Sequence, residues 1–134
     1  MKVSNRVRGV GLSTKSLISI IDDDEGVREA IGGLMRSLGF AVATFPSAAD
    51  FLAYANVPET SCLIADVQMS GMTGIELYSQ LRGSGFSIPT ILITTYPNDS
   101  VRARVLADGV ICYLSKPFDE DALLRCISAA LKRI

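Results

Sequence analysis

Short apolar runs alternate with longer amphipathic stretches from Leu17 onward, and few folds accommodate such a pattern. The apolar runs are rich in Ile, Leu and Val, and they lie at residues 17–21, 41–45, 62–65, 91–94 and 110–114. They have the length of strands, and each is followed by a stretch of helical length. This alternation is typical of parallel sheets whose crossover connections are helices. We therefore predict an α/β fold, a doubly wound three-layer sandwich with a five-stranded parallel sheet and five helices.

The amphipathic stretches carry recognisable helix ends. In the first, apolar residues recur at helical spacing over 27–38 and stop at Gly39, which suits a left-handed C-terminal cap. The other stretches lie at residues 47–54, 74–82, 100–107 and 119–132. We expect Ser47 and Asp119 to be N-caps and Gly109 to end the fourth helix.

The residue counts fit one domain and exclude several kinds of chemistry. With 134 residues, 49% of them hydrophobic and 20% charged, the chain has the size and composition of one ordinary globular domain. It contains no histidine. This excludes Ser-His and Cys-His nucleophile pairs, zinc held by histidine, and a histidine phosphodonor within this chain. Its chemistry has to use carboxylates, hydroxyls, lysine or thiols.

Charge divides the chain into two parts. Residues 1–15 hold four basic and no acidic residues, and we expect them to form a flexible basic N-terminal extension. Residues 16–134 hold the remaining 9 basic and all 14 acidic residues, and we expect them to form the folded domain. The formal net charge of the whole chain, −1, offers no overall field for nucleic acid or an anionic membrane. We expect neither as a partner.

The cysteines indicate a reducing compartment. Cys62, Cys112 and Cys126 are odd in number and have no CxxC spacing, so we expect neither a disulfide framework nor a thiolate metal site. No stretch has the form of a signal peptide, and none approaches the ~18 apolar residues of a membrane span. The sequence predicts a cytoplasmic protein.

Reactive side chains follow four of the five expected strands. Asp22 begins an acidic run after the first, Asp66 follows the third, Thr94 ends the fourth, and Lys116 follows the fifth. In open parallel sheets, ligands bind beyond the carboxyl ends of the strands. Carboxylates crowded there repel one another, and Mg²⁺ would hold them ionised together. Lysine and a threonine hydroxyl beside that metal suit a phosphoryl group.

The acidic run allows two other interpretations. Taken alone, residues 22–25 are better explained as the acidic first turn of a helix. An EF-hand loop beginning at Asp22 fails, because it needs glycine at its sixth position and glutamate at its twelfth, where this chain has Val27 and Gly33. However, carboxylates, a hydroxyl and a lysine are expected to meet at one edge of the sheet. Their combination favours a site that binds a metal ion and a phosphoryl group.

Four segments together resemble a known family. They are IIDDD at 20–24, LIADVQMSGMTGIEL at 63–77, ILIT at 91–94 and YLSKPF at 113–118. In this order they resemble the receiver domain of two-component response regulators, over about residues 17–133, and most nearly receivers of the nitrogen-fixation regulator type. The resemblance implies a flavodoxin-like sheet with strand order 2-1-3-4-5.

The resemblance also implies how the acidic residues act. Asp66 would be the phosphoacceptor, which attacks the phosphorus of a phosphohistidine on a partner sensor histidine kinase. Asp23, Asp66 and the backbone carbonyl of Gln68 would bind Mg²⁺ directly, and Asp22 would bind it through a water. Asp24 is then expected to be the N-cap of the first helix.

A signalling switch is implied by the same resemblance. Lys116 would pair with the phosphoryl oxygens, and its peptide bond to Pro117 is expected to be cis. The phosphoryl group would draw the Thr94 hydroxyl inward, and Tyr113 would rotate into the space left. The fourth helix, fifth strand and fifth helix would then present a changed surface, used for homodimerisation. The chain is expected to signal rather than to act as an enzyme.

Two residues after Thr94 depart from the family pattern. Thr95 replaces the usual alanine or glycine, and its bulk is expected to narrow access for the phosphodonor. By the resemblance, Tyr96 and Gln68 occupy positions that tune loss of the phosphoryl group, and the large Tyr96 is expected to shield the acyl phosphate from water and so to slow its hydrolysis.

Two other functions stay open. One is a receiver fold that acts as a phosphorylation-independent interaction module. The other is a metal-dependent phosphatase that uses Asp22 and Asp24 as an Asp-x-Asp nucleophile motif. The phosphatase is disfavoured because Lys116 is followed by Pro117 and Phe118 rather than by a further acidic pair.

Overall fold

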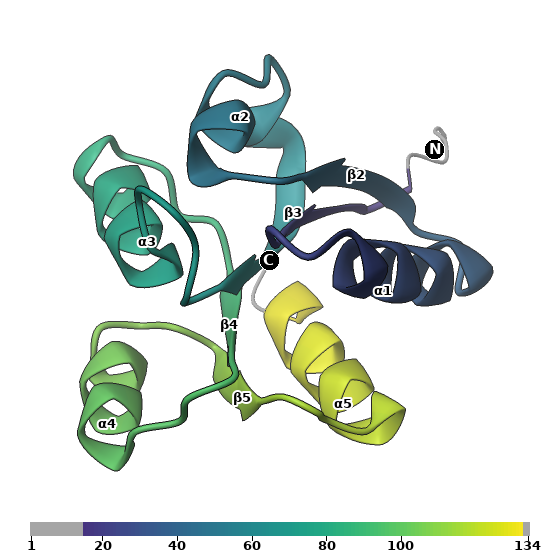
Figure 1. Ribbon diagram of the computed structural model, residues 1–134. Coiled ribbons are helices and arrows are strands. Elements are labelled where there is room, and N and C mark those ends of the chain that lie inside the picture. Colours follow the sequence, from purple (N-terminus) through teal and green to yellow (C-terminus); the bar gives the residue numbers. More distant parts are fainter. Residues whose placement is uncertain (1–14, 133–134) are drawn as a thin grey trace.

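The five predicted strands form one parallel sheet. The computed structural model describes residues 15–132, and its strands are β1 (Leu17–Ile21), β2 (Ala41–Phe45), β3 (Thr60–Asp66), β4 (Thr90–Thr94) and β5 (Cys112–Ser115). Every neighbouring pair is parallel, and the spatial order is β2-β1-β3-β4-β5 (Figure 1). The predicted α/β class and strand order are confirmed.

Helices cover both faces of the sheet. They are α1 (Glu25–Ser37), α2 (Ala48–Leu52), α3 (Gly74–Gly83), α4 (Asp99–Ala107) and α5 (Glu120–Leu131), with a short 3₁₀ helix, Val57–Glu59, between α2 and β3. In Figure 1, α1 and α5 lie on one side of the sheet and α2, α3 and α4 on the other. This is the predicted three-layer sandwich.

Strand β3 shows how the two layers of core arise. Leu63 and Ala65 belong to the core cluster that packs under α2, α3 and α4, whereas Cys62 and Ile64 belong to the cluster under α1 and α5. Successive strand residues point to opposite faces, so a strand covered on both sides has to be apolar at nearly every position. The continuous apolar runs of the sequence therefore mark central strands.

The predicted helix caps are present. The side chains of Asp24, Ser47 and Asp119 accept hydrogen bonds from the backbone N–H groups three residues later, at 3.2, 3.1 and 2.7 Å. Gly39 and Gly109 follow α1 and α4 with φ values of +94° and +113°, the left-handed region in which glycine has no steric penalty.

Several boundaries differ from the sequence prediction by one or two residues, and two of them have a clear physical reason. Strand β5 begins at Cys112 rather than at residue 110, because the backbone N–H of Val110 donates back to the Val105 carbonyl in the turn after α4. Helix α2 ends at Leu52, two residues early, because Tyr54 N donates to the Phe51 carbonyl in a tighter turn. The 3₁₀ helix has no counterpart in the sequence prediction. The predicted flexible extension, residues 1–15, lies outside the described residues except for Lys15.

A disulfide joins β5 to α5, and the expectation of no disulfide is wrong. It links Cys112 to Cys126, whose Cα atoms lie 6.0 Å apart. The crossover from β5 into α5 folds the chain back on itself, so a spacing of 14 residues becomes a direct contact. Cys62 is a buried thiol, and burial raises its pKa to about 12, which leaves it unreactive at neutral pH.

Reduction of the Cys112–Cys126 bond is expected to lower the free energy of unfolding by about 2–3 kcal/mol, because the bond restricts the unfolded chain. Urea unfolding followed by circular dichroism, with and without dithiothreitol, measures this. The Cys112→Ser variant is the control and should be insensitive to dithiothreitol. An unchanged midpoint for the unmodified chain, with three thiols titrated before reduction, would contradict the pairing.

Candidate functional site

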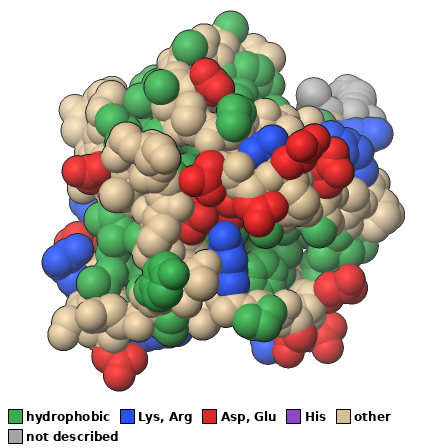
Figure 2. Space-filling view, viewed as in Figure 1, with side chains coloured by type: hydrophobic (Ala, Val, Ile, Leu, Met, Phe, Trp, Pro, Cys, Tyr) green, Lys and Arg blue, Asp and Glu red, His purple; other side chains and the backbone are tan. Residues whose placement is uncertain are grey.

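The side chains predicted at the strand ends do meet. The Lys116 ammonium Nζ lies 2.9 Å from Asp22 Oδ2 and 3.2 Å from Asp66 Oδ2. Both carboxylates are buried, and the lysine is largely so. Figure 2 shows acidic side chains gathered in the middle of this face, with a basic side chain beside them. Parallel strands end at the same edge, so residues up to 94 positions apart become neighbours.

Three carboxylates form a candidate metal centre. Asp22, Asp23 and Asp66 each offer an oxygen, and these oxygens lie within 4.8 Å of one another. Asp23 is exposed while the other two are buried, so the group opens to solvent on one side. Oxygen ligands with room for several waters suit Mg²⁺, which keeps part of its hydration shell when it binds.

The electrostatics of the site call for more positive charge than Lys116 supplies. Burial and the neighbouring Asp22 carboxylate raise the pKa of the Asp66 carboxyl above its ordinary value, although the Lys116 ammonium lowers it. Burial also opposes the charge of Lys116, but the hydrogen bonds and charges of Asp22 and Asp66 outweigh burial and raise its pKa. The positive charge of one lysine does not balance the negative charges of two buried carboxylates. A divalent cation would supply the missing positive charge.

The loop after β1 holds Asp22 firmly. Asp22 Oδ1 accepts a hydrogen bond from Asp24 N at 2.9 Å, and Oδ2 accepts from Lys116. Arg28 Nη1 donates to the Asp22 carbonyl at 2.6 Å, which ties α1 to the same loop. The Asp24 side chain caps α1 instead of joining the cluster, so the Asp22 and Asp24 pair is not arranged as a catalytic Asp-x-Asp motif.

The turn after β3 fixes Asp66. Its Oδ1 accepts a hydrogen bond from Gln68 N at 3.1 Å. Helix α3 then begins at Gly74, so close to β3 that a Cβ atom there would overlap the Asp66 carbonyl oxygen and lie 3.0 Å from the carbonyl carbon. Thr73 and Glu76 close a capping box at this helix start. The position of α3 therefore depends on glycine at residue 74.

Thr94 and Tyr113, the two residues expected to act as a switch, take definite positions in this structure. The Thr94 hydroxyl is fully buried and donates to Gln68 Oε1 at 2.8 Å. Tyr113 is already buried, its hydroxyl accepts from Asn98 N at 3.2 Å, and the Arg102 guanidinium lies 5.1 Å from its ring centre. The inward position of Tyr113 is thus occupied while Thr94 is bound to Gln68.

Two further expectations concern residues beside the site. The Lys116-Pro117 peptide bond is cis, as predicted. Tyr96 is 73% exposed, so most of its side chain faces solvent in this structure.

Sequence reasoning missed three contributions. The Gln68 side chain, the close approach at Gly74 and the Asn98 contact with Tyr113 all depend on segments distant in sequence. For Gly74 a weak signal existed, since a glycine that opens a helix is unfavourable unless it is needed for packing. The family resemblance marks Gln68 as a position that tunes loss of the phosphoryl group, but it does not indicate the side-chain contact with Thr94.

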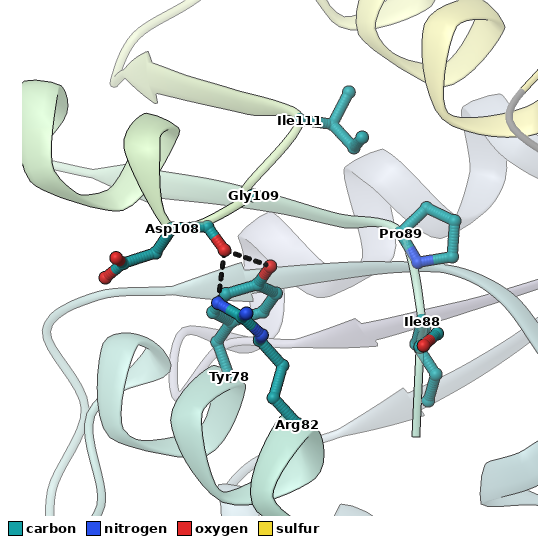
Figure 3. Close-up of a pocket in the computed structure, with 8 residues that line it drawn as sticks. Tyr78, Arg82, Ile88, Pro89, Asp108, Gly109 and Ile111 are labelled. Carbon is teal, nitrogen blue, oxygen red and sulfur yellow. Dashed lines mark hydrogen bonds between the residues drawn. The ribbon is translucent and has the colours of Figure 1, made fainter. Parts of the chain in front are cut away.

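Among the hollows of the described structure, two bear on the site by their positions. A groove of about 490 Å³ runs between α1 and α5, next to Lys116 and Thr95, and most of its lining is apolar, with Val27, Leu34 and Phe118 among the side chains. A cavity of about 310 Å³ lies at the opposite end of the strands. There Tyr78 Oη and Arg82 Nη1 both donate to the Asp108 carbonyl (Figure 3). That cavity contains no residue of the predicted site.

Comparison with known proteins agrees with this geometry. The sequence matches the response regulator receiver domain over residues 18–128. The chain belongs to the receiver domain family. Response regulator protein TodT of Pseudomonas putida is 40% identical to this receiver domain over 117 residues, which cover 87% of the chain and 52% of TodT. Transcriptional regulatory protein FixJ of Azorhizobium caulinodans is 36% identical over 117 residues, covering 87% of the chain and 55% of FixJ.

Solved structures of receiver domains are similar to this chain over most of its length. The response regulator StyR superposes with a TM-score of 0.82 at 40% identity, over 90% of this chain and 61% of that one. FixJ-N superposes with a TM-score of 0.79 at 28% identity, over 91% and 98%. This chain is thus similar, in sequence and in fold, to the receiver domains of response regulators.

Two facts concern the extent of the chain and of its helices. The chain spans about half the length of the curated relatives it matches. Among residues 15–132, every helix is too short or too polar to cross a membrane.

Proposed function

We propose that this receiver domain takes a phosphoryl group from a sensor histidine kinase onto Asp66. The observation that carries the proposal is the buried Asp66 carboxylate at the end of β3, 3.2 Å from the Lys116 ammonium and grouped with Asp22 and Asp23. A carboxylate oxygen of Asp66 attacks phosphorus, the P–N bond to the kinase imidazole breaks, and an acyl phosphate remains. These 134 residues contain no histidine, so the phosphohistidine lies outside them.

The acidic residues divide the metal ligation between them. Asp23, Asp66 and the Gln68 backbone carbonyl would hold Mg²⁺ directly, and Asp22 would hold it through a water. The engagement of both Asp22 oxygens, by Asp24 N and by Lys116, supports this indirect role. An Mg²⁺ ion held by these residues would supply positive charge for the phosphoryl oxygens. Lys116 lowers the pKa of the Asp66 carboxyl against the effect of burial, and it would pair with the phosphoryl oxygens as the second cation.

The kinase would dock over the groove between α1 and α5. A phosphohistidine has to come within bonding distance of Asp66, so its protein has to cover the surface around the site. The apolar groove adjoins Lys116 and Thr95 and offers area for a stable contact. We place this exchange in the cytoplasm.

Phosphorylation would be transmitted through Thr94 and Tyr113 to the surface of α4, β5 and α5. Thr94 and Lys116 lie on adjacent strand ends, joined by a 2.7 Å hydrogen bond from Lys116 N to the Thr94 carbonyl. Tyr113 contacts α4 through Asn98 N and Arg102. A change at Thr94 therefore has a short route to α4, and we propose that this face forms a homodimer after phosphorylation.

Incubation with Mg²⁺ and acetyl phosphate tests the phosphoacceptor role. Intact mass spectrometry should show one added phosphoryl group, which is lost when EDTA replaces Mg²⁺ and in the Asp66→Asn variant. The Asp50→Asn variant, which changes an exposed aspartate of α2, is the control and should be phosphorylated normally.

The other outcomes separate the competing functions. A well-folded chain that never gains a phosphoryl group would indicate a phosphorylation-independent interaction module. Repeated turnover of acetyl phosphate that Asp22→Asn abolishes and Asp66→Asn preserves would indicate a phosphatase. Either result would overturn the proposed function.

A further inference from the structure

One oxygen of the Gln68 side chain gathers two hydrogen-bond donors at the rim of the site. Gln68 Oε1 accepts from Thr94 Oγ1 at 2.8 Å and from Thr95 N at 3.2 Å. A backbone N–H donates only to an acceptor, so the contact with Thr95 identifies this atom of the amide as the oxygen. The arrangement joins the loop after β3 to the end of β4.

The Thr94 hydroxyl has no proton left for another acceptor. Its oxygen accepts a hydrogen bond from Tyr96 N at 3.0 Å, and its single proton points to Gln68. Thr94 is fully buried, so water does not offer it an alternative partner. Gln68 thus satisfies the hydroxyl of a fully buried residue that would otherwise lack an acceptor.

Both donors stand next to the phosphoacceptor. Asp66 pairs in register with Ile93 across β3 and β4, so Thr94 and Thr95 are the next two residues beyond the paired position. Gln68 is also bonded to Asp66, since its backbone N donates to Asp66 Oδ1. Gln68 therefore contacts the Asp66 carboxylate through its backbone N–H and the Thr94 hydroxyl through its side chain.

We propose that the Gln68 side chain is a latch whose amide oxygen occupies, before phosphorylation, the position of a phosphoryl oxygen. The inference rests on the proposed function of Asp66. An oxygen of a phosphoryl group on Asp66 needs donors on this side of the site, and Thr94 Oγ1 and Thr95 N are the two that converge there. One proton cannot serve both acceptors, so phosphorylation has to displace the Gln68 side chain.

The latch has a defined consequence for the switch. It stabilises the unphosphorylated arrangement of the β4 end and leaves the phosphorylated arrangement unaffected once the amide has moved to solvent. Loss of the amide oxygen should therefore favour the phosphorylated state. Gln68 is a positioning residue in this scheme, because it acts through Thr94 and Thr95 rather than on the phosphoryl group.

Equilibrium binding of beryllofluoride, a tetrahedral mimic of a phosphoryl group, tests the latch in the presence of Mg²⁺. The Gln68→Met variant keeps the length of the side chain and removes the oxygen, and it should bind beryllofluoride about fivefold more tightly, since net hydrogen bonds are worth up to about tenfold in an equilibrium. The amide NMR signal of Thr95 reports binding. Gln80→Met, an exposed change on α3, is the matched control and should bind as the unmodified chain does.

A second pair of measurements distinguishes a side chain that holds Thr94 and Thr95 by hydrogen bonds from one that only covers the site sterically. In a Thr94→Ala background the effect of Gln68→Met should shrink, because one of the two bonds is already absent. Without beryllofluoride, the Thr95 amide should exchange with deuterium faster in Gln68→Met and Gln68→Ala than in the unmodified chain.

Failure of the latch and failure of the proposed function give different results. An unmodified chain that does not bind beryllofluoride with Mg²⁺ would overturn both. Normal binding by the unmodified chain, with equal or weaker binding by Gln68→Met, would overturn the latch alone. So would a gain in affinity that persists in full when Thr94 is alanine.

Discussion

Replacement of Lys116 by methionine is expected to lower the free energy of unfolding by about 3 kcal/mol at neutral pH in EDTA. The ammonium contacts Asp22 at 2.9 Å and Asp66 at 3.2 Å, and both carboxylates are buried. Without it, two like charges remain in a site that water hardly reaches. Urea unfolding followed by circular dichroism measures the loss.

The dependence on pH and metal identifies the cause. The pKa of Asp66 is already raised by burial and by Asp22, and loss of Lys116 raises it further. A carboxyl with a raised pKa in the folded state takes up its proton more readily there than in the unfolded chain, so the deficit should shrink as pH falls. Mg²⁺ should restore part of the stability by binding the folded state.

Two controls accompany the Lys116 variant. Lys116→Arg keeps the positive charge and should lose less stability than Lys116→Met. Lys132→Met removes an exposed lysine at the C-cap of α5 and should change stability by under about 0.5 kcal/mol. Equal stability of Lys116→Met and the unmodified chain in EDTA would show that the lysine does not compensate the buried carboxylates.

Replacement of Gly74 by alanine is expected to lower the free energy of unfolding by about 2 kcal/mol, because the added methyl group overpacks the contact between α3 and β3. The methyl carbon would overlap the Asp66 carbonyl oxygen and lie 3.2 Å from Leu92 Cδ2. Relief requires α3 or the end of β3 to move, and Asp66 stands on that end. Phosphorylation by acetyl phosphate should therefore slow as well.

A second glycine of the same helix gives the matched control. Gly83, the last residue of α3, has open space where a Cβ atom would lie, with nothing within 4 Å, and its φ is outside the left-handed region. Gly83→Ala should leave stability unchanged or slightly raised and phosphorylation normal. Similar behaviour of the two alanine variants would contradict the steric argument.

The layers of the fold could be predicted because burial imposes its own period on the sequence. Strands covered on both faces are apolar at nearly every position, and the predicted bounds of β1 and β2 match the structure. The start of β5 was misplaced because Val110 is apolar yet belongs to the turn after α4. An apolar side chain indicates that a residue is buried. Whether that residue lies in a strand or in the turn before it depends on its backbone hydrogen bonds.

The outline of the site could be predicted because parallel strands end at one edge. That rule alone assembled Asp22, Asp66, Thr94 and Lys116 from four separate segments, and the resemblance then assigned their proposed roles. It could not say which acid would face inward. The structure buries Asp22, leaves Asp23 exposed and turns the Asp24 side chain to cap α1.

The sequence by itself determined the fold class, the strand order through the family resemblance, and the four strand ends that carry the chemistry. These depend on periodicity and on the order of residues along the chain. Only the tertiary structure decided the Cys112–Cys126 pair, the fit of α3 at Gly74 and the hold of Gln68 on Thr94. Each of these is a contact of a few ångströms between different elements, and its geometry depends on how those elements pack.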